Sequence, residues 1–147
     1  YPKWNLDEAL ACGDQMHKLI KSSNWVHVLA NMYGNDPAKL EDIKSEEDNF
    51  RFILNTFTRM RYCSQEGELD LIINSPPGTQ PAHLVPWYEL SGPSSPPYRL
   101  FFGHWASLGI HTYKNVTCMD SGCVWGRSLT AFCIETNQFY SAPQNKV

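Results

Sequence analysis

The stretch between residues 99 and 134 carries the side chains best suited to chemistry. Residues 99–102 form a short, aromatic-rich run of the kind found in buried strands, and His104 follows it directly after Gly103. A histidine at a strand end is expected to face a crevice, where its neutral imidazole can bind zinc, manganese, iron or cobalt. The glycine lets the backbone pass close to a ligand. His104 is therefore a candidate metal ligand, and on the residues alone the alternative is a structural histidine.

A second turn of small and reactive residues, Asp-Ser-Gly-Cys-Val-Trp-Gly at 120–126, begins sixteen residues after His104. The stretch that follows, 128–134, alternates as a half-buried strand does. Two strand-end turns next to each other would form a site. The whole stretch therefore predicts strand, turn, strand, turn and strand, with reactive side chains in the turns.

The cysteines of this stretch allow two other interpretations. Cys118 and Cys123 with His111 would suggest a structural zinc site, but no second pair of ligands stands at usable spacing. Cys123 beside Asp120 would suggest a thiol hydrolase, for which the sequence has no local signature. Neither interpretation is favoured by the spacing.

Two cations, Arg59 and Arg61, stand two residues apart, so in an extended segment their side chains would point the same way. Guanidinium groups match phosphate oxygens in pairs, which makes either arginine a candidate phosphate ligand. The alternative is a pair of surface charges.

Composition limits the class of protein. With 147 residues, 42% of them hydrophobic and 13% aromatic, the chain can form one globular domain. A net charge of −3 argues against an extended nucleic-acid surface, so no DNA partner is expected, and a polyphosphate ligand would need metal ions. No apolar run approaches the length of a membrane span, so no membrane partner is expected either. Five scattered cysteines, an odd number, favour free thiols in a reducing cytoplasm.

Helices are expected in the first part of the chain. Asn5 is a plausible N-cap for a helix that extends to about Ser22, and the spacing of apolar residues predicts a short helix over 24–32. Residues 38–48 are charged and are expected to be solvated. Ser45 begins the clearest helix, whose apolar stripe is at i, i+3, i+4 and i+7, namely Phe50, Ile53, Leu54 and Phe57.

After this helix the sequence predicts a hairpin over 62–73, with its turn at Glu66 and Gly67. Seven prolines between residues 76 and 97 exclude regular helix and predict a long irregular loop over 74–97. Trp87 and Tyr88 are expected to anchor its middle.

Four motifs, in this order, resemble one enzyme family: MYGNDP at 32–37, NTFTRMRYC at 55–63, FGHWAS at 102–107 and MDSGCVWG at 119–126. They resemble the C-terminal half of the symmetrical bis(5′-nucleosyl)-tetraphosphatases, the diadenosine tetraphosphate hydrolases of the metallophosphoesterase superfamily. The likeness extends from residue 2 to about residue 143 and is weakest over 38–48.

The resemblance implies an α/β fold, a calcineurin-like two-sheet sandwich with flanking helices. Residues 1–147 would be the C-terminal portion of this single domain, and 74–97 would be an insertion loop near the substrate. The activity implied is metal-dependent hydrolysis of diadenosine tetraphosphate to two ADP. The alternatives are another metallophosphoesterase, such as a protein or RNA-cap phosphatase, and a non-catalytic binding or scaffold domain.

The resemblance also implies roles for individual residues. His104 would bind one of two divalent metal ions (manganese, cobalt, magnesium, iron or zinc), and Arg59 or Arg61 would bind a phosphate. The residue types of Tyr33 and Asn35, and not the resemblance, make them candidates to stack on or hydrogen-bond an adenosine, and packing within the fold is the alternative for them.

Several features of the family are missing. The motifs that supply most of its metal ligands, Asp-x-His, Gly-Asp-x-x-x-Arg-Gly, Gly-Asn-His and His-Ala-Gly, are absent from the 147 residues. We therefore expect the N-terminal half of the enzyme to be a necessary partner and the isolated chain to be inactive. Arg127, where the family has a glycine, and a shortened turn over 107–113 are departures that bear on substrate fit.

Overall fold

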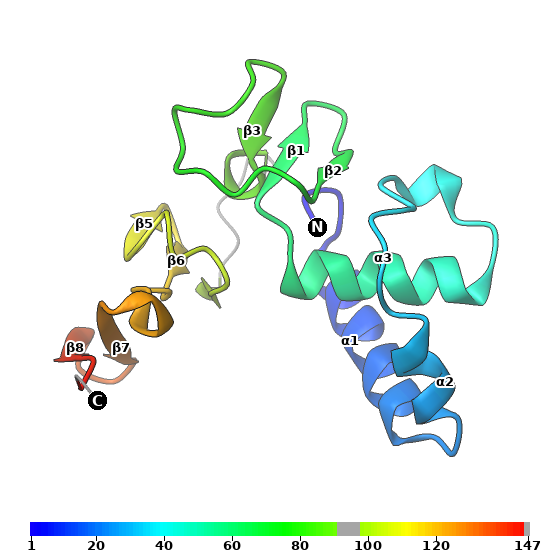
Figure 1. Cartoon of the computed structure of the whole chain (residues 1–147), viewed down its shortest axis with the longest axis horizontal. Coiled ribbons are helices and arrows are strands. Elements are labelled where there is room, and N and C mark those ends of the chain that lie inside the picture. Colours follow the sequence, from blue (N-terminus) through cyan, green and yellow to red (C-terminus); the bar gives the residue numbers. More distant parts are fainter. Residues whose placement is uncertain (91–97, 146–147) are drawn as a thin grey trace. The chain divides into compact units, whose positions relative to one another are not determined.

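The structure is a computed structural model that describes residues 1–90 and 98–145. The chain divides into two compact units (Figure 1). The first unit consists of Tyr1–Ile73 with Pro81–Gly92, and the second of Asn74–Gln80 with Pro93–Val147. All α-helices of the described residues belong to the first unit, and both units contain short strands. The fold is therefore mixed α/β, as predicted.

Helix α1, Leu6–Lys21, begins with a reciprocal capping box. The Asn5 side-chain oxygen accepts a hydrogen bond from the Glu8 amide at 2.9 Å, and the Glu8 carboxylate accepts one from the Asn5 amide at 2.8 Å. Lys18 and Lys21 stand in the last turn, where they complement the helix dipole. The helix predicted from Asn5 is confirmed.

Helix α2, Trp25–Ala30, confirms the short helix predicted over 24–32. The core of the first unit lies where α1, α2 and a third helix, α3, Glu46–Thr58, meet. Four buried side chains from the three helices form one cluster: Met16, Val28, Phe50 and Ile53. The partly buried side chains of Trp4, Leu19 and Leu54 pack against this cluster.

Helix α3, Glu46–Thr58, begins where Ser45 accepts a hydrogen bond from the Asp48 amide at 3.0 Å. Its predicted apolar stripe is wrong at Phe57, whose side chain is 51% exposed, whereas Phe52 is completely buried. Phe52 is buried because the rings of Tyr1 and Trp4 pack edge-on against it, with centroids 5.2 and 6.1 Å away. Within the described residues, the only ring that contacts Phe57 is that of Trp4, with centroids 5.8 Å apart. The helix is therefore buried over a wider arc than its own sequence indicates.

The sheet of the first unit is antiparallel and has the order β2-β1-β3, in which β3 is Leu84–Pro86. Strands β1, Tyr62–Ser64, and β2, Leu69–Asp70, form the predicted hairpin. Strand β2 is shorter than predicted because the Asp70 carboxylate accepts hydrogen bonds from the amides of Ile72 and Ile73, which turns the chain out of the ladder.

The proline-rich segment is more regular than expected where the structure describes it. Strand β3, Leu84–Pro86, pairs with β1, and a 3₁₀ turn, Trp87–Glu89, follows it. Trp87 and Tyr88 are buried, as predicted for the middle of this segment. Positions 91–97 of the predicted loop lie outside the described residues. The expected solvated segment 38–48 likewise contains one 3₁₀ turn, Leu40–Asp42.

In the second unit, β4, Leu100–Phe102, runs parallel to β6, Val116–Cys118, and β5, His111–Tyr113, pairs antiparallel to β6. Strand β4 is half-buried and not buried as predicted, whereas β6 is fully buried because it is the central strand.

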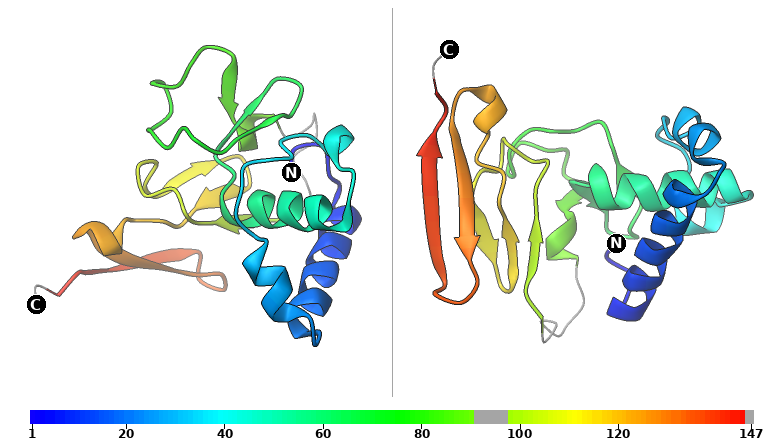
Figure 2. Two further views of the ribbon diagram at one scale, coloured as in Figure 1. Left: turned by 45° about the vertical axis from the view of Figure 1, so that its right-hand side comes forward. Right: turned by 90° about the horizontal axis from the view of Figure 1, so that it is seen from below.

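A long hairpin follows the three-stranded sheet (Figure 2). It consists of β7, Ser128–Cys133, and β8, Gln138–Pro143, and β7 confirms the strand predicted over 128–134. A 3₁₀ turn, Cys123–Trp125, precedes it. The buried indole of Trp105 donates a hydrogen bond to the carbonyl oxygen of Ser75 at 3.3 Å, which fastens residues 74–80 to this unit.

None of the described helices is both long and apolar enough to cross a membrane. The five cysteines are thiols, as the sequence indicated.

The buried thiol of Cys63 predicts a loss of stability at alkaline pH. Burial raises its pKa from 9.0 to about 12. The unfolded chain therefore releases this proton first, so the stability present below pH 9 is lost as the pH rises toward 12, at about 1.4 kcal/mol per pH unit. Urea titrations at pH 8, 9 and 10 should show a shallower pH slope for Cys63→Ala than for the half-buried Cys133→Ala. Equal slopes would contradict this explanation.

Candidate functional site

Arg59 follows helix α3 and holds a loop in place. Its Nη1 donates to the carbonyl oxygen of Gly34 at 3.2 Å and to Oδ1 of Asn55 at 3.0 Å. Its Nη2 donates to Oδ1 of Asn35 at 3.0 Å and to the carbonyl oxygen of Leu71 at 3.5 Å. The four Nη hydrogens of Arg59 thus all have neutral oxygen acceptors within the first unit.

Asn55 is the residue that sequence reasoning missed. It is 1% exposed, its Oδ1 accepts from Arg59, and its Nδ2 donates to the carbonyl oxygen of Gly34 at 3.0 Å. A buried amide must have such partners, because an unsatisfied one is costly. The sequence did offer one signal: the polar side chain of Asn55 follows the apolar Phe52 and Ile53 on α3 and stands one helical turn before Arg59.

Arg51, within α3, holds the same loop on either side of Gly34 and Asn35. Arg51 donates from Nε to the carbonyl oxygen of Asn31 at 3.3 Å and from Nη1 to that of Asp36 at 3.0 Å. Gly34 has φ +136°, and a Cβ on it would come within 3.1 Å of the Arg51 side chain. The loop therefore needs glycine at this position and is fixed by α3 at both ends.

Replacement of Asn55 by alanine should lower the free energy of unfolding by about 2–3 kcal/mol, because it removes a buried acceptor of Arg59 Nη1 and one of the two donors to the carbonyl oxygen of Gly34. Asn49→Ala, on the same helix but half-buried and without a side-chain hydrogen bond among the described residues, should change it by less than about 0.5 kcal/mol. Urea denaturation measures both. A loss of equal size in the two variants would show that Asn55 has no special role.

The structure brings two of the predicted site residues together, Asn35 and Arg59, through the 3.0 Å hydrogen bond. Tyr33, on the same loop, is 79% exposed, so packing within the described residues does not account for it. Arg61 is half-buried, and its carbonyl oxygen accepts a hydrogen bond from the Trp87 amide at 3.0 Å. Arg59, Arg61, Tyr33 and Asn35 all belong to the first unit.

His104 belongs to the second unit, two residues beyond the end of β4, and is exposed. Its φ is +62°, a left-handed conformation uncommon for residues other than glycine and concentrated at functional sites. The strand end is fixed by a hydrogen bond of 2.7 Å from the Met119 amide to the carbonyl oxygen of Phe102.

The turn that was predicted to lie beside His104 is held by its own short side chains. The Asp120 carboxylate accepts a hydrogen bond from the Gly122 amide at 3.0 Å, and Ser121 donates to the carbonyl oxygen of Ser128. Thr130 in turn donates to the Ser121 hydroxyl at 2.8 Å. These contacts connect the turn to the start of β7.

Over residues 1–90 and 98–145, no group of three or more histidine, cysteine, aspartate and glutamate side chains is placed to hold a metal ion. The zinc site considered for Cys118, Cys123 and His111 is therefore not formed by these residues. Cys118 is completely buried, and burial raises its pKa, which disfavours the thiolate that binds zinc. His104 alone is one ligand, so the described side chains do not by themselves fit a two-metal site.

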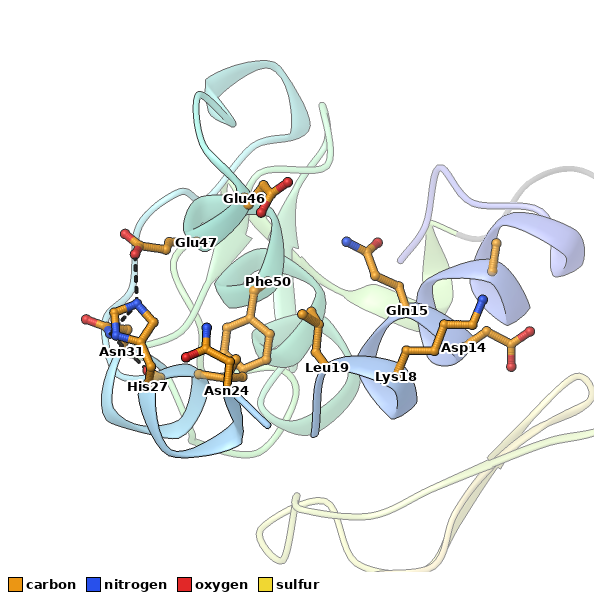
Figure 3. A pocket seen from close by; sticks show the side chains of 12 residues that line it. Asp14, Gln15, Lys18, Leu19, Asn24, His27, Asn31, Glu46, Glu47 and Phe50 are labelled. Atoms are coloured by element: carbon orange, nitrogen blue, oxygen red, sulfur yellow. Dashed lines mark hydrogen bonds and ion pairs between the residues drawn. The ribbon is translucent and has the colours of Figure 1, made fainter. Parts of the chain in front are cut away.

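A cavity of 690 Å³ lies among α1, α2 and the first turn of α3 (Figure 3). Its floor includes Leu19 and Phe50, and its polar rim includes the ion pair between His27 and Glu47, 3.2 Å apart. None of the predicted site residues lines it.

No family model matches the chain. Curated relatives do match it, and each is named symmetrical bis(5′-nucleosyl)-tetraphosphatase, which is a hydrolase. The protein of Cellvibrio japonicus is 40% identical over 92% of this chain and 50% of its own length, and that of Aliivibrio fischeri (strain ATCC 700601 / ES114) is 37% identical over 95% and 52%. The protein of Klebsiella aerogenes is 38% identical over 99% of this chain and 56% of its own length. The chain thus spans about half the length of these relatives and is similar to them along nearly all of its own sequence.

Proposed function

We propose that the chain is the C-terminal part of a metallophosphoesterase that hydrolyses diadenosine tetraphosphate to two ADP. The observation that carries this proposal is the identity of 37–40% to relatives named for symmetrical cleavage of this class of substrate, over 92–99% of the chain. Similarity spread along the whole chain, and not confined to one motif, argues for a common function.

In this proposal residues 1–147 are part of one calcineurin-like sandwich, and 74–97 are an insertion near the substrate. The relatives are about twice as long as this chain. The half of the enzyme that the chain does not cover would supply most of the metal ligands. His104 would supply an imidazole to one of two divalent ions, for which manganese, cobalt, magnesium, iron and zinc are the candidates. Such ions polarise phosphates and lower the pKa of bound water.

In this proposal Arg59 and Arg61 have different roles, one in positioning the loop and one in binding phosphate. The Nη hydrogens of Arg59 already donate to protein oxygens, so binding a phosphate through them would break the contacts that hold the loop. We therefore assign Arg59 to positioning of Asn35. Arg61 belongs to the same Thr-Arg-Met-Arg motif, and we assign the phosphate to it because a guanidinium there would offset developing negative charge. Tyr33, exposed on the same loop, would stack on an adenine.

A chimera tests the proposal. The matching segment of the Klebsiella aerogenes protein is replaced by this chain, and diadenosine tetraphosphate is supplied with manganese or cobalt. The proposal expects two ADP per substrate, separated by ion-exchange chromatography. ATP and AMP as products would indicate another phosphoesterase. A soluble, folded chimera without any turnover would favour a binding or scaffold domain.

A further inference from the structure

The second unit contains a cavity of 430 Å³ that has no role in the proposed function. It lies between the three-stranded sheet and the β7–β8 hairpin. The sheet contributes Thr112 from β5 and Thr117 from β6, and the hairpin contributes Phe132 from β7 and Phe139 from β8. The two elements touch here, since the rings of Phe101 and Phe132 are 5.2 Å apart.

The cavity is cationic although the chain as a whole has a net charge of −3. The described residues of this unit include three cations, Arg99, Lys114 and Arg127, and the first two line the cavity. The acidic residues of the same part, Asp120 and Glu135, do not. Within the described residues neither lining cation forms an ion pair. The cavity therefore favours an anionic ligand.

Arg99 is fixed in place by aromatic rings. Its guanidinium carbon lies 5.2 Å from the centroid of Phe101 and 4.6 Å from that of Phe132, distances typical of cation–π contacts. An arginine held in this way keeps its charge and its planar donors without a carboxylate partner. It can therefore donate a pair of hydrogen bonds to an incoming phosphate.

The β7–β8 hairpin adds an apolar surface to the cavity. Phe139 packs against Phe132 with centroids 4.7 Å apart, yet 47% of its side chain stays exposed. The sheet adds the hydroxyls of Thr112 and Thr117, which lie 3.1 Å apart, and a hydroxyl can donate to or accept from a ligand. Cations, hydroxyls and an aromatic ring line a cavity of the size that small ligands occupy.

We propose that this cavity binds a nucleoside monophosphate. The phosphate lies between Arg99 and Lys114, the sugar meets the threonine hydroxyls, and the base rests on Phe139, because stacking and charge pairing are the two contacts that nucleotides offer. None of these residues has a role in the proposed hydrolysis. The inference therefore stands independently of that activity.

Isothermal titration calorimetry of the chain with AMP, inorganic phosphate and adenosine, in buffer containing a chelator, tests the site. AMP should bind more tightly than either of its two parts. Arg99→Ala should weaken AMP binding at least tenfold, as should Lys114→Ala, which removes an exposed ammonium that lies 5.1 Å from the centroid of the Tyr113 ring. Phe139→Leu should weaken AMP but not phosphate.

Two control variants separate this site from others. Arg127→Gln removes a cation of the same unit outside the cavity, and Arg61→Ala removes the proposed phosphate ligand of the catalytic site; both should leave AMP affinity within twofold. Absence of AMP binding at millimolar concentration would overturn the proposal. Equal losses from Arg99→Ala and Arg127→Gln, or phosphate that binds as tightly as AMP, would overturn it as well.

Discussion

Removal of the His104 imidazole should abolish most of the metal-dependent hydrolysis of diadenosine tetraphosphate by the chimera. Partners that merely orient a metal ligand are worth about 10–100-fold in activity, so loss of the ligand itself should cost at least about 100-fold in kcat/KM. Two substitutions are needed, because His104 has φ +62°. Alanine removes the ring and strains the backbone, whereas glycine adopts this φ freely and removes only the ring.

His104→Ala and His104→Gly should therefore lose activity equally and should both contain less bound metal, measured by atomic emission. His111→Ala is the matched control, since it removes an exposed histidine of the same unit, and it should retain turnover. If His104→Gly kept normal turnover and metal content, the assignment of His104 as a ligand would be wrong.

Arg61→Ala and Arg59→Ala should differ in kind. A charge-assisted hydrogen bond is worth roughly 1.5–3 kcal/mol, so loss of the Arg61 guanidinium should lower kcat/KM by about 10–100-fold for every polyphosphate substrate. Arg59→Ala removes a guanidinium that donates to Asn55 and to the Gly34–Asn35 loop, so it should lower the free energy of unfolding by about 2–4 kcal/mol.

Activity and stability must therefore be measured on both variants. Arg59→Lys should not restore stability, because a single ammonium group cannot donate to all four of the oxygens that accept from the Arg59 guanidinium. Arg59→Ala leaves the Gly34–Asn35 loop without its anchoring hydrogen bonds, so it should raise KM more than it lowers kcat. Arg61→Ala removes a phosphate ligand and should lower kcat. Small and equal effects on activity and stability would return both arginines to ordinary surface charges.

The elements that the sequence predicted well are those with local signals. Asn5 and Ser45 mark the starts of α1 and α3 because an N-cap contacts residues of the same first turn. The hairpin of β1 and β2 is similarly defined by a turn between two apolar runs. Such contacts connect residues close in sequence, so the sequence alone indicates them.

The features that escaped prediction depend on distant residues. Phe52 is buried by rings from the N-terminus, and β3 pairs with β1 from beyond a proline-rich stretch. The same is true of the candidate site. Tyr33, Asn35 and the two arginines were candidates because of their residue types and the motifs in which they stand. The hydrogen bonds from Arg59 and Asn55 to the Gly34–Asn35 loop connect residues more than twenty positions apart in the sequence. No local pattern encodes such a contact.

The central claim is that this chain is one part of a symmetrical tetraphosphatase and lacks most of its metal ligands. The most direct test mixes purified residues 1–147 with the separately expressed remaining half of the Klebsiella aerogenes protein, in the presence of manganese or cobalt. Each part alone should be inactive, and the mixture should convert diadenosine tetraphosphate to two ADP. Turnover by residues 1–147 alone, at the rate of the mixture, would contradict the claim, because the chain would then hold a complete site of its own.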